Sequence, residues 1–356
     1  MLKIGMLTSG GDCQGLNAAL RGVAKTLYNE LGDKVTIYGI RDGYRGLIEG
    51  DYHEMLPEDF SDILTVGGTI LGTSRQPFKE MRKTIEDSEE TKLDKMLHTV
   101  KKAGFDCLVI LGGNGTHKTA NLLSMKGVNV VTLPKTIDND LWGTELTFGF
   151  QSAIDIASTV IDSIHSTAFS HSRVFIVEVM GHKAGWLTLY AGIASGADVI
   201  VIPEIPYSAK KIAAAIEKRA KAGKRFSIIA VAEGAISQDE AKLSKKAARE
   251  AMTYPSISYR IADELKELTG QEIRVTIPGH YQRGGAPCPV DRVLTSRFGV
   301  AAAQLILQKK FGYMVALQDN HIVPVPLTEV AGKLKTVPPD GELVKQARAL
   351  GLSMGD

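Results

Sequence analysis

Short apolar runs recur along the chain, and most of them end in glycine or polar residues that open an amphipathic helix. The clearest runs cover residues 2–8, 106–111 and 129–133. After the first of them, apolar residues at helical spacing form one stripe: Leu16, Leu20, Val23, Leu27 and Leu31. Continuously apolar strands that alternate with such helices are typical of parallel sheets covered on both faces. The pattern predicts an α/β fold.

The alternation continues past residue 170. Further strands are predicted at 34–40, 173–179, 198–202 and 226–232, a long helix at 146–169, and helices starting near 183 and 208. These strands are too many for one sheet, so we predict two doubly wound, Rossmann-like α/β/α domains with mainly parallel sheets and the active site in the cleft between them. The expected larger domain is 1–149 plus about 268–317, and the smaller is 150–267 plus about 318–356.

Two segments do not fit the alternation. Residues 79–97 are dense in charge, which favours a solvated surface helix or an insertion. The tail from residue 323 contains four prolines and is expected to wrap loosely around the protein.

Composition excludes several classes of protein. The 42 Lys and Arg residues nearly balance the 40 Asp and Glu residues, so no basic field points to nucleic acid. No apolar run approaches the ~20 residues that span a bilayer. The three cysteines, Cys13, Cys107 and Cys288, lie far apart and suit a reduced cytosol better than a disulfide framework or a zinc site. We therefore expect a cytoplasmic protein that binds neither nucleic acid nor membranes.

Two glycine-rich loops follow predicted strands and open helices. One covers residues 10–15 and the other is Gly112-Gly113-Asn114-Gly115-Thr116. Glycine lets the backbone approach a ligand closely, and a helix N-terminus offers N–H groups to an anion. Two such loops on one sheet suggest a polyphosphate or a phosphorylated substrate, although each alone is also compatible with a simple helix-opening turn.

A third strand end carries two carboxylates, in Thr136-Ile137-Asp138-Asn139-Asp140. In an extended segment residues i and i+2 point the same way, so one of these carboxylates could accept a proton from a substrate hydroxyl while the other holds Mg²⁺ directly or through water. An Asp/Asn-rich turn with local hydrogen bonds is the alternative. With the glycine loops, a base, a metal and nearby cations meet the needs of phosphoryl transfer, and Arg75 and Lys135 are candidate cations.

A second basic cluster lies at residues 279–285. His280 and Arg283 are flanked by glycines, with Arg274 just upstream. Such a cluster could bind a phosphate monoester, although a basic surface turn is the simpler interpretation.

In this order and spacing, these motifs closely resemble the 6-phosphofructokinase family, from residue 4 to about 318. The resemblance implies transfer of a phosphoryl group from ATP to the 1-hydroxyl of fructose 6-phosphate, in glycolysis, with Mg²⁺ as the metal. It implies Asp138 as the general base, supported by Arg75, Thr136 and Lys135. It also implies that Asn114 and Asp140 face the metal.

The resemblance assigns further residues to each substrate. Those implied to bind the nucleotide are Gly11, Tyr44 (on the adenine side), Arg75, Gln76, Gly113, Asn114, Gly115 and Thr116. Those implied to bind the sugar phosphate are Thr136, Asp138, Arg173, Met180, Gly181, His182, Glu233, Arg274, His280 and Arg283. Arg173 matches an arginine that the family donates from a neighbouring subunit, which implies a homotetramer or homodimer.

Departures from the family pattern leave two phosphoryl donors open. Asn114 replaces a carboxylate and His182 replaces an arginine. Gly115 matches family members that use ATP, whereas Lys135 matches those that use diphosphate. We expect ATP, because a lysine can coexist with the nucleotide while a side chain at position 115 would occupy its space; diphosphate is the alternative donor.

A non-catalytic role is a further alternative. Asn114 and His182 would also suit a sugar-phosphate sensor that does not turn over its ligand, but Asp138, Asp140, Arg75 and Arg283 argue against it. Allosteric control is not assumed, because Lys25 stands where the family's effector site usually has a second arginine.

Overall fold

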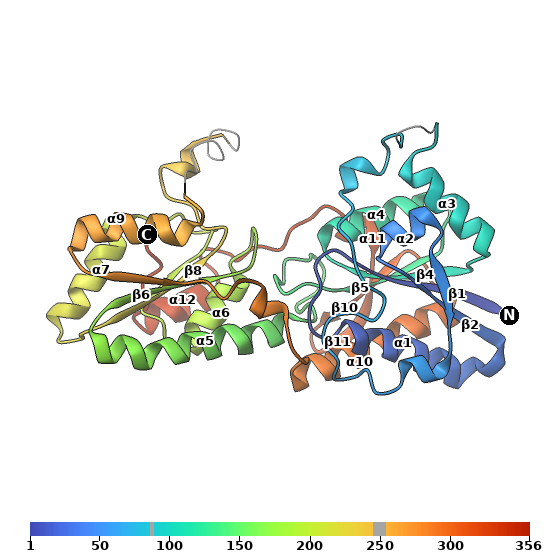
Figure 1. The fold of residues 1–356 in the computed structure, drawn as a ribbon, viewed down its shortest axis with the longest axis horizontal. Helices are drawn as coiled ribbons and strands as arrows, with labels where there is room; N and C mark the ends of the chain where they lie inside the picture. Colours follow the sequence, from blue (N-terminus) through green and yellow to red (C-terminus); the bar gives the residue numbers. More distant parts are fainter. Residues whose placement is uncertain (86–88, 245–253) are drawn as a thin grey trace. The chain divides into compact units, whose positions relative to one another are not determined.

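The computed structural model describes residues 1–85, 89–244 and 254–356, and it divides the chain into two compact units (Figure 1). Unit 1 consists of residues 1–137, 141–152 and 283–334, and unit 2 of residues 138–140, 153–282 and 335–356. Within the described ranges, no helix combines the length and apolar character that crossing a membrane requires.

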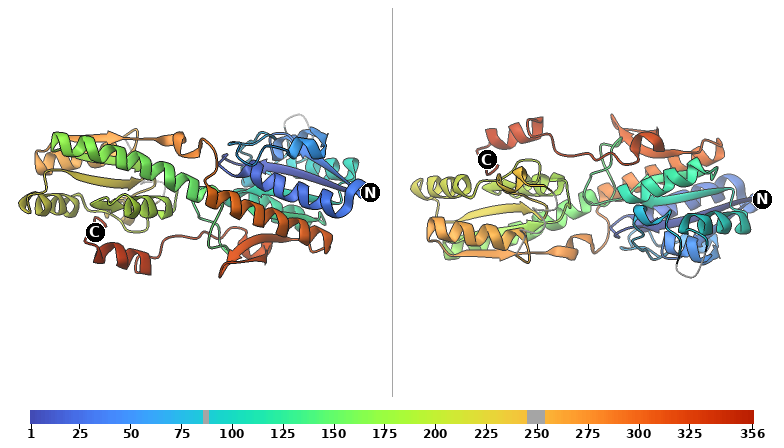
Figure 2. Two further views of the ribbon diagram at one scale, coloured as in Figure 1. Left: turned by 90° about the horizontal axis from the view of Figure 1, so that it is seen from below. Right: turned by 90° about the horizontal axis from the view of Figure 1, so that it is seen from above.

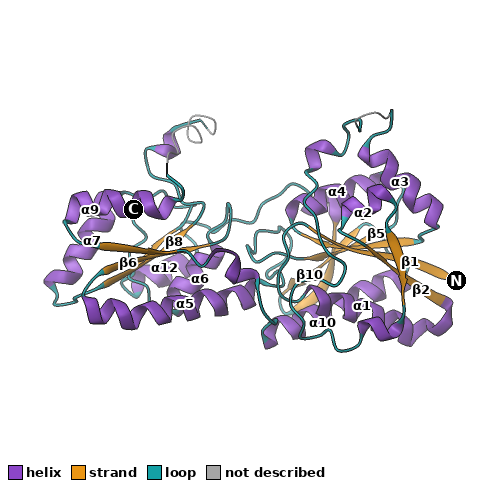
Figure 3. Ribbon diagram, in the orientation of Figure 1, coloured by secondary structure: helices purple, strands orange, loops and turns teal. Residues whose placement is uncertain are grey.

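Unit 1 is built on a seven-stranded sheet with the strand order β11-β10-β5-β4-β1-β2-β3. Its strands are β1 (Leu2–Ser9), β2 (Val35–Ile40), β3 (Tyr52–Met55), β4 (Cys107–Gly112), β5 (Val130–Pro134), β10 (Tyr313–Gln318) and β11 (His321–Pro326). The five inner strands pair in parallel, and only the edge strands β3 and β11 are antiparallel. The predicted mainly parallel sheet is confirmed (Figure 3).

Helices cover both faces of this sheet. On one face lie α2 (Tyr44–Glu49), α3 (Lys92–Ala103), α4 (Asn114–Met125) and α11 (Leu327–Val330), whose apolar side chains join the core (Figure 1). On the other face α1 (Leu16–Leu31) packs against α10 (Pro289–Leu307). These two helices cross at Gly22 and Gly299, where a Cβ on Gly299 would lie 2.7 Å from the Gly22 Cα. Glycine at both positions therefore sets the close approach.

Unit 2 has a four-stranded, fully parallel sheet in the order β7-β8-β6-β9. Its strands are β6 (Val174–Val179), β7 (Val199–Val201), β8 (Ser227–Ala232) and β9 (Ile273–Thr276). The helices α7 (Ala209–Lys221) and α9 (Ile257–Thr269) share one core with the sheet. The helices α5 (Phe150–His171) and α6 (Trp186–Ala194) lie on its other face (Figures 1 and 2).

The charged segment 79–97, expected as a solvated surface helix or an insertion, is an α-helix only from Lys92 onward. A short 3-10 turn (Phe78–Glu80) comes first, and α3 begins only at Lys92. Thr91 and Asp94 cap α3 reciprocally: the Thr91 hydroxyl accepts the Asp94 N–H at 3.1 Å, and the Asp94 carboxylate accepts the Thr91 N–H at 2.9 Å. Because Met81 and Met96 are buried, the segment is part of the fold; residues 86–88 lie outside the described ranges.

The expectation of a loosely wrapped tail is also wrong. Residues 321–326 form β11, and a further helix, α12 (Glu342–Ala349), follows. Pro324 and Pro326 are tolerated in β11 because it is an edge strand, where one side needs no N–H donor. The same pairings explain why the unit boundaries differ from those expected: β9 joins residues 268–282 to unit 2, and β11 joins residues 318–334 to unit 1.

Candidate active site

The first glycine loop connects β1 to α1 in unit 1. Gly10 has a φ of +92°, and it is held by hydrogen bonds from its N–H to the Ser74 carbonyl (3.1 Å) and from the Thr73 hydroxyl to its own carbonyl (2.8 Å). At Gly11 the guanidinium of Arg283 lies so close that a Cβ would be 2.1 Å from Nη1. Arg283 also donates to the Asp12 carbonyl at 3.1 Å. Glycine at position 11 thus makes room for an arginine on the loop.

The second glycine loop connects β4 to α4. Gly113 is the N-cap of α4 and Gly115 lies in its first turn, where a Cβ would meet no atom within 4 Å. The first N–H groups of a helix have no partner within the helix and are suited to an anion. The Thr116 hydroxyl donates to the Ser9 carbonyl at 3.4 Å, so this loop is tied to the end of β1.

Lys135 joins both loops. It follows β5, is buried, and donates from its ammonium to the Gly11 carbonyl, while its N–H donates to the Gly112 carbonyl at 3.0 Å. A buried cation with helix N-termini on either side favours a polyphosphate anion at this edge of the sheet. Sequence order alone separates these loops by about a hundred residues; the parallel pairing of β1, β4 and β5 brings them together.

Two other ionisable groups beside these loops are uncharged near neutral pH. Burial lowers the pKa of His117 to about 4, and its Nδ1 lies 2.9 Å from the Gly113 carbonyl, which it meets as a neutral N–H donor. Burial raises the pKa of the Cys13 thiol to about 12, so this thiol is not a nucleophile. The positive charge at the loops therefore comes from Lys135 and Arg283.

The acidic motif is a turn, and the prediction of an extended segment is wrong. Ile137 and Asp138 form the turn, and Asn139 has a φ of +49°, so Asp138 and Asp140 are not related by strand geometry. The N–H of Lys335 donates to the Asp140 carbonyl at 2.9 Å, and its ammonium donates to Asn139 Oδ1 at 3.0 Å. Asp138 is half-buried and Asp140 is buried, which suits a general base and a metal ligand in unit 2.

The residues predicted to face the metal fit Mg²⁺ only together with substrate oxygens. Within the described residues, no group of three or more His, Cys, Asp or Glu side chains is placed to hold a metal ion. Mg²⁺ usually takes one or two protein oxygens and keeps waters and substrate phosphates. The amide nitrogen of Asn114 donates to the Lys333 carbonyl at 2.5 Å, so the amide oxygen of Asn114 is not used in that contact. The second candidate ligand is the carboxylate of the buried Asp140.

In unit 2, Glu233 organises the loop that follows β6. Its carboxylate accepts the N–H groups of Gly181 (3.3 Å) and His182 (2.8 Å), and Met180 N–H donates to Gln282 at 3.2 Å. His182 has a φ of +51°, a strained backbone that these bonds support. Met180, Gly181, His182 and Glu233 therefore meet at the carboxyl edge of the second sheet.

Arg173 and Arg274 lie at the opposite edge of the same sheet. Both pair with Glu272, Arg173 through Nε at 2.7 Å, and Arg274 stands opposite Phe175 near the start of β6. Arg173 precedes Met180 by seven residues, which along a strand is about 20 Å. Within one chain, these two arginines therefore lie far from Met180 and Glu233. His280 differs from them: it is exposed and follows the carboxyl end of β9.

Tyr44 does not fit its predicted place beside adenine. The side chain is 1% exposed, and its hydroxyl donates to the Thr116 carbonyl at 2.9 Å. Burial raises the pKa of this phenol well above its ordinary value. Tyr44 is a core residue that supports the second glycine loop through its hydrogen bond to Thr116.

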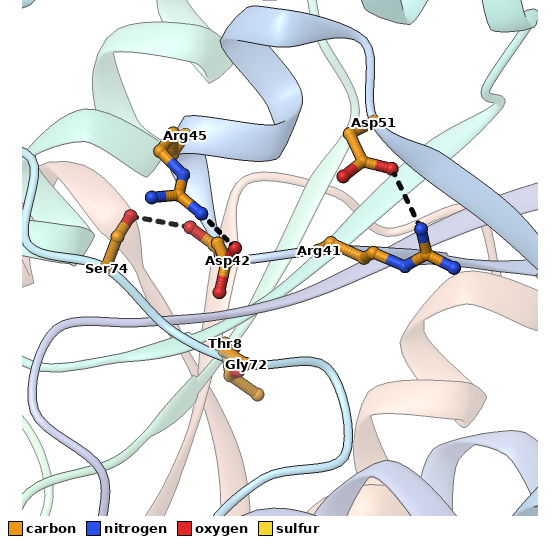
Figure 4. Close-up of polar contacts among 7 residues, drawn as sticks. All are labelled: Thr8, Arg41, Asp42, Arg45, Asp51, Gly72 and Ser74. Carbon is orange, nitrogen blue, oxygen red and sulfur yellow. Dashed lines mark hydrogen bonds and ion pairs between the residues drawn. The ribbon is translucent and has the colours of Figure 1, made fainter.

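Hydrogen bonds hold the segment that carries Arg75 and Gln76, and they come from residues that the sequence analysis did not select as site residues (Figure 4). The Ser74 hydroxyl donates to the Asp42 carbonyl at 2.6 Å, and the Thr8 hydroxyl donates to the Gly72 carbonyl at 2.7 Å. The Asp42 carboxylate pairs with Arg45, and Gln76 accepts a hydrogen bond from Lys92 at 2.9 Å. Arg75 itself is exposed, and in the described part of the chain it forms no ion pair or hydrogen bond. The turn sequence Asp42-Gly43 is the signal that could have indicated this support.

The doubly wound fold and the phosphate-type loops define a phosphate-binding α/β protein, and comparison with known proteins identifies the family. The chain belongs to the phosphofructokinase family, whose model, described as Phosphofructokinase, matches residues 3–306. A protein of Spirochaeta thermophila named ATP-dependent 6-phosphofructokinase is 55% identical over 357 residues, covering 99% of this chain and 97% of its relative. ATP-dependent 6-phosphofructokinase 3 of Bacteroides thetaiotaomicron is 47% identical, covering 99% and 100%.

Solved structures agree with this assignment. Phosphofructokinase from Saccharomyces cerevisiae matches with a TM-score of 0.79 and 32% identity; the match covers 92% of this chain, which spans 45% of the length of the yeast chain. A pyrophosphate-dependent phosphofructokinase from Nitrosospira multiformis has a TM-score of 0.82, covering 99% and 92%. At 21% identity, the latter supports the fold alone.

Proposed function

We propose that the chain transfers the terminal phosphoryl group of ATP to the 1-hydroxyl of fructose 6-phosphate, giving fructose 1,6-bisphosphate and ADP in glycolysis. The observation that carries the proposal is that both glycine loops are bonded to Lys135, directly before the turn that bears Asp138: Gly11 to its ammonium and Gly112 to its main-chain N–H. The proposed location is the cytoplasm, and the three free thiols suit a reducing compartment.

ATP is favoured over diphosphate as donor. The space beside Gly115 is open, so a nucleotide can occupy it without meeting a side chain. The Lys135 ammonium is already engaged with the Gly11 carbonyl, so we assign it the role of shaping the loop and neutralising phosphate charge. The names of the relatives from Spirochaeta thermophila and Bacteroides thetaiotaomicron point to the same donor.

In the proposed reaction, Asp138 accepts the proton of the 1-hydroxyl as its oxygen attacks the γ-phosphorus of ATP, and the bond to the β-phosphate oxygen breaks. The N-terminus of α4, Lys135 and the exposed guanidinium of Arg75 offset the negative charge of the phosphates. Asn114 and Asp140 would hold Mg²⁺, which when bound supplies further charge neutralisation at the phosphates.

We propose that Glu233, the loop 180–182, Thr136 and His280 bind the sugar phosphate. Arg173 and Arg274 are proposed to act on the site of a second copy of the chain, in a homodimer or homotetramer. Support comes from their place at the amino edge of the sheet, about 20 Å along β6 from Met180. Arg283, which the sequence grouped with the sugar phosphate, contacts the first glycine loop in unit 1 and is proposed to help order that loop.

The test is steady-state turnover with fructose 6-phosphate and Mg²⁺, comparing ATP with diphosphate. We expect product from ATP, and a loss of about 10²–10⁴-fold in turnover in Asp138→Ser with fructose 6-phosphate binding retained. The exposed Asp162→Ser on α5 is the matched control and should leave turnover unchanged. Preference for diphosphate would make Lys135 the donor determinant, and binding of sugar phosphate without turnover from either donor would favour the sensor role.

A further inference from the structure

The tail that follows unit 1's last helix returns to the turn that bears the proposed general base. Within unit 2, Lys335 contacts this turn twice: its N–H donates to the Asp140 carbonyl at 2.9 Å and its ammonium donates to Asn139 Oδ1 at 3.0 Å. These contacts flank Asp138 on its C-terminal side. A residue nearly two hundred positions further along the chain therefore fixes the local shape of the acidic motif.

The tail is itself anchored at Lys335 and again at Val337. The Trp186 indole N–H donates to the Lys335 carbonyl at 3.0 Å, and the Lys335 ammonium lies 5.7 Å from the centre of the same ring. Two residues later, Val337 is buried and its N–H donates to Glu204 at 2.9 Å. Glu204 also accepts the Gly185 N–H at 2.9 Å, at the start of α6. The Lys335 backbone therefore rests on the framework of unit 2.

We propose that Lys335 is a positioning residue for phosphoryl transfer, which holds the Asp138–Asp140 turn in its reactive shape through Asn139 and the Asp140 backbone. This inference rests on the proposed function of Asp138. Asn139 occupies the left-handed region with a φ of +49°, which asparagine adopts more readily than most residues because its side chain can hydrogen-bond locally. The charge-assisted bond from Lys335 to Asn139 Oδ1 holds that side chain.

Kinetics distinguish positioning from substrate binding. Because Lys335 is proposed to act through the turn, its loss should lower kcat more than it changes the KM for either substrate. A displacement of the base by about 1 Å is enough to reduce turnover by up to about 10²-fold. We expect Lys335→Met to lower kcat about 10-fold or more, with the KM for ATP and for fructose 6-phosphate changed by less than about 2-fold. Lys335→Arg, which keeps the charge and a donor, should recover part of the loss.

Asn139→Gly supplies the second variant. Glycine adopts a positive φ without strain, so this change removes the acceptor Oδ1 while leaving the backbone shape accessible. It should reproduce the kcat loss of Lys335→Met, and the double variant should lose no more than either single variant. The matched control is Lys345→Met, an exposed lysine on α12, which should behave as wild type.

Amide hydrogen exchange gives a readout that does not depend on activity. Exchange of a peptide covering residues 136–145 should become faster in Lys335→Met and in Asn139→Gly than in wild type, with the melting midpoint retained. Wild-type kcat in Lys335→Met, multiplicative losses in the double variant, or a parallel fall in kcat and melting midpoint would each overturn the positioning role. If the wild-type chain turned over neither donor, the proposed function would fail, and unchanged exchange in both variants would separately refute the contact's role in ordering the turn.

Discussion

The ammonium of Lys135, at the end of β5, donates a hydrogen bond to the main-chain carbonyl of Gly11, at the end of β1. One buried side chain thereby fixes a loop that belongs to a strand two positions away in the sheet order. The same lysine contacts the second loop through its N–H and the Gly112 carbonyl at 3.0 Å. The two phosphate-type loops are thus both bonded to Lys135, one through its ammonium and the other through its main-chain N–H.

Replacing Lys135 should destabilise the first glycine loop and weaken the binding of ATP. Lys135→Met removes a charge-assisted hydrogen bond worth about 1.5–3 kcal/mol, so the KM for ATP should rise about 10-fold or more. Steady-state kinetics with ATP as the varied substrate provides the measurement. Lys126→Met, exposed at the C-terminal end of α4, is the control. An unchanged KM for ATP would remove Lys135 from the donor site.

Weakening the Glu233 carboxylate should affect the sugar phosphate. Glu233→Gln keeps an acceptor oxygen but replaces two charge-assisted bonds to the Gly181 and His182 N–H groups with neutral ones, which are about half as strong. The KM for fructose 6-phosphate should rise about 5-fold, and more in Glu233→Ala, while the KM for ATP stays near wild type. The exposed Glu217→Gln on α7 should have no effect. A rise in the KM for ATP instead would contradict the assignment of this loop to the sugar.

The buried phenol of Tyr44 should contribute to stability and not to nucleotide binding. Tyr44→Phe removes the hydroxyl that donates to the Thr116 carbonyl, and the free energy of unfolding should fall by about 1 kcal/mol. Denaturant unfolding measures this change, with the exposed Tyr259→Phe as the comparison. The KM for ATP should change by less than about 2-fold, because the ring is covered by protein. A large increase in that KM would restore Tyr44 to the adenine side.

The buried imidazole of His117 should make stability depend on pH. Burial lowers its pKa from 6.5 to about 4, so between these values the unfolded chain binds more protons than the folded one. Stability contributed by the neutral His117 is therefore complete above pH 6.5, is lost as the pH falls, and is gone below pH 4. The total loss is about 3 kcal/mol.

The difference between wild type and a variant isolates this effect. In His117→Gln the decline in the free energy of unfolding between pH 6.5 and pH 4 should be smaller than in wild type, measured by denaturant unfolding at several pH values. His98→Gln, exposed on α3, should retain the wild-type decline. Parallel pH profiles for wild type and His117→Gln would show that the imidazole is protonated without cost.

Local patterns in the chain were sufficient for much of the fold. The apolar runs located β1, β4, β5, β6 and β8 to within one or two residues, because a strand buried on both faces leaves an unbroken apolar signal. The apolar runs did not locate the start of α3, because the signal there is a capping box at the N-cap Thr91 inside a charged segment. They also did not reveal β11, whose prolines suggested a loop until its edge position was known.

For the candidate site too, some residues could be recognised from the sequence, whereas their contacts could be seen only in the structure. Gly11, Gly113 and Asp138 stand out in the sequence because glycine loops and paired carboxylates are local and chemically distinctive. Only the tertiary structure showed that Tyr44 is buried, that Asn139 turns the acidic motif, and that Arg173 lies at the far edge of the sheet from Met180. These depend on strand pairing and burial, which join residues that are distant in the chain.

The sequence by itself determined the α/β class and the order of the phosphate-type loops, because these follow from periodicity and residue type. The tertiary structure decided which of those residues meet: Lys135 with Gly11, Glu233 with His182, and Lys335 with Asn139. The reason is physical, since each of these contacts forms only when parallel pairing and packing bring together segments that the chain holds far apart.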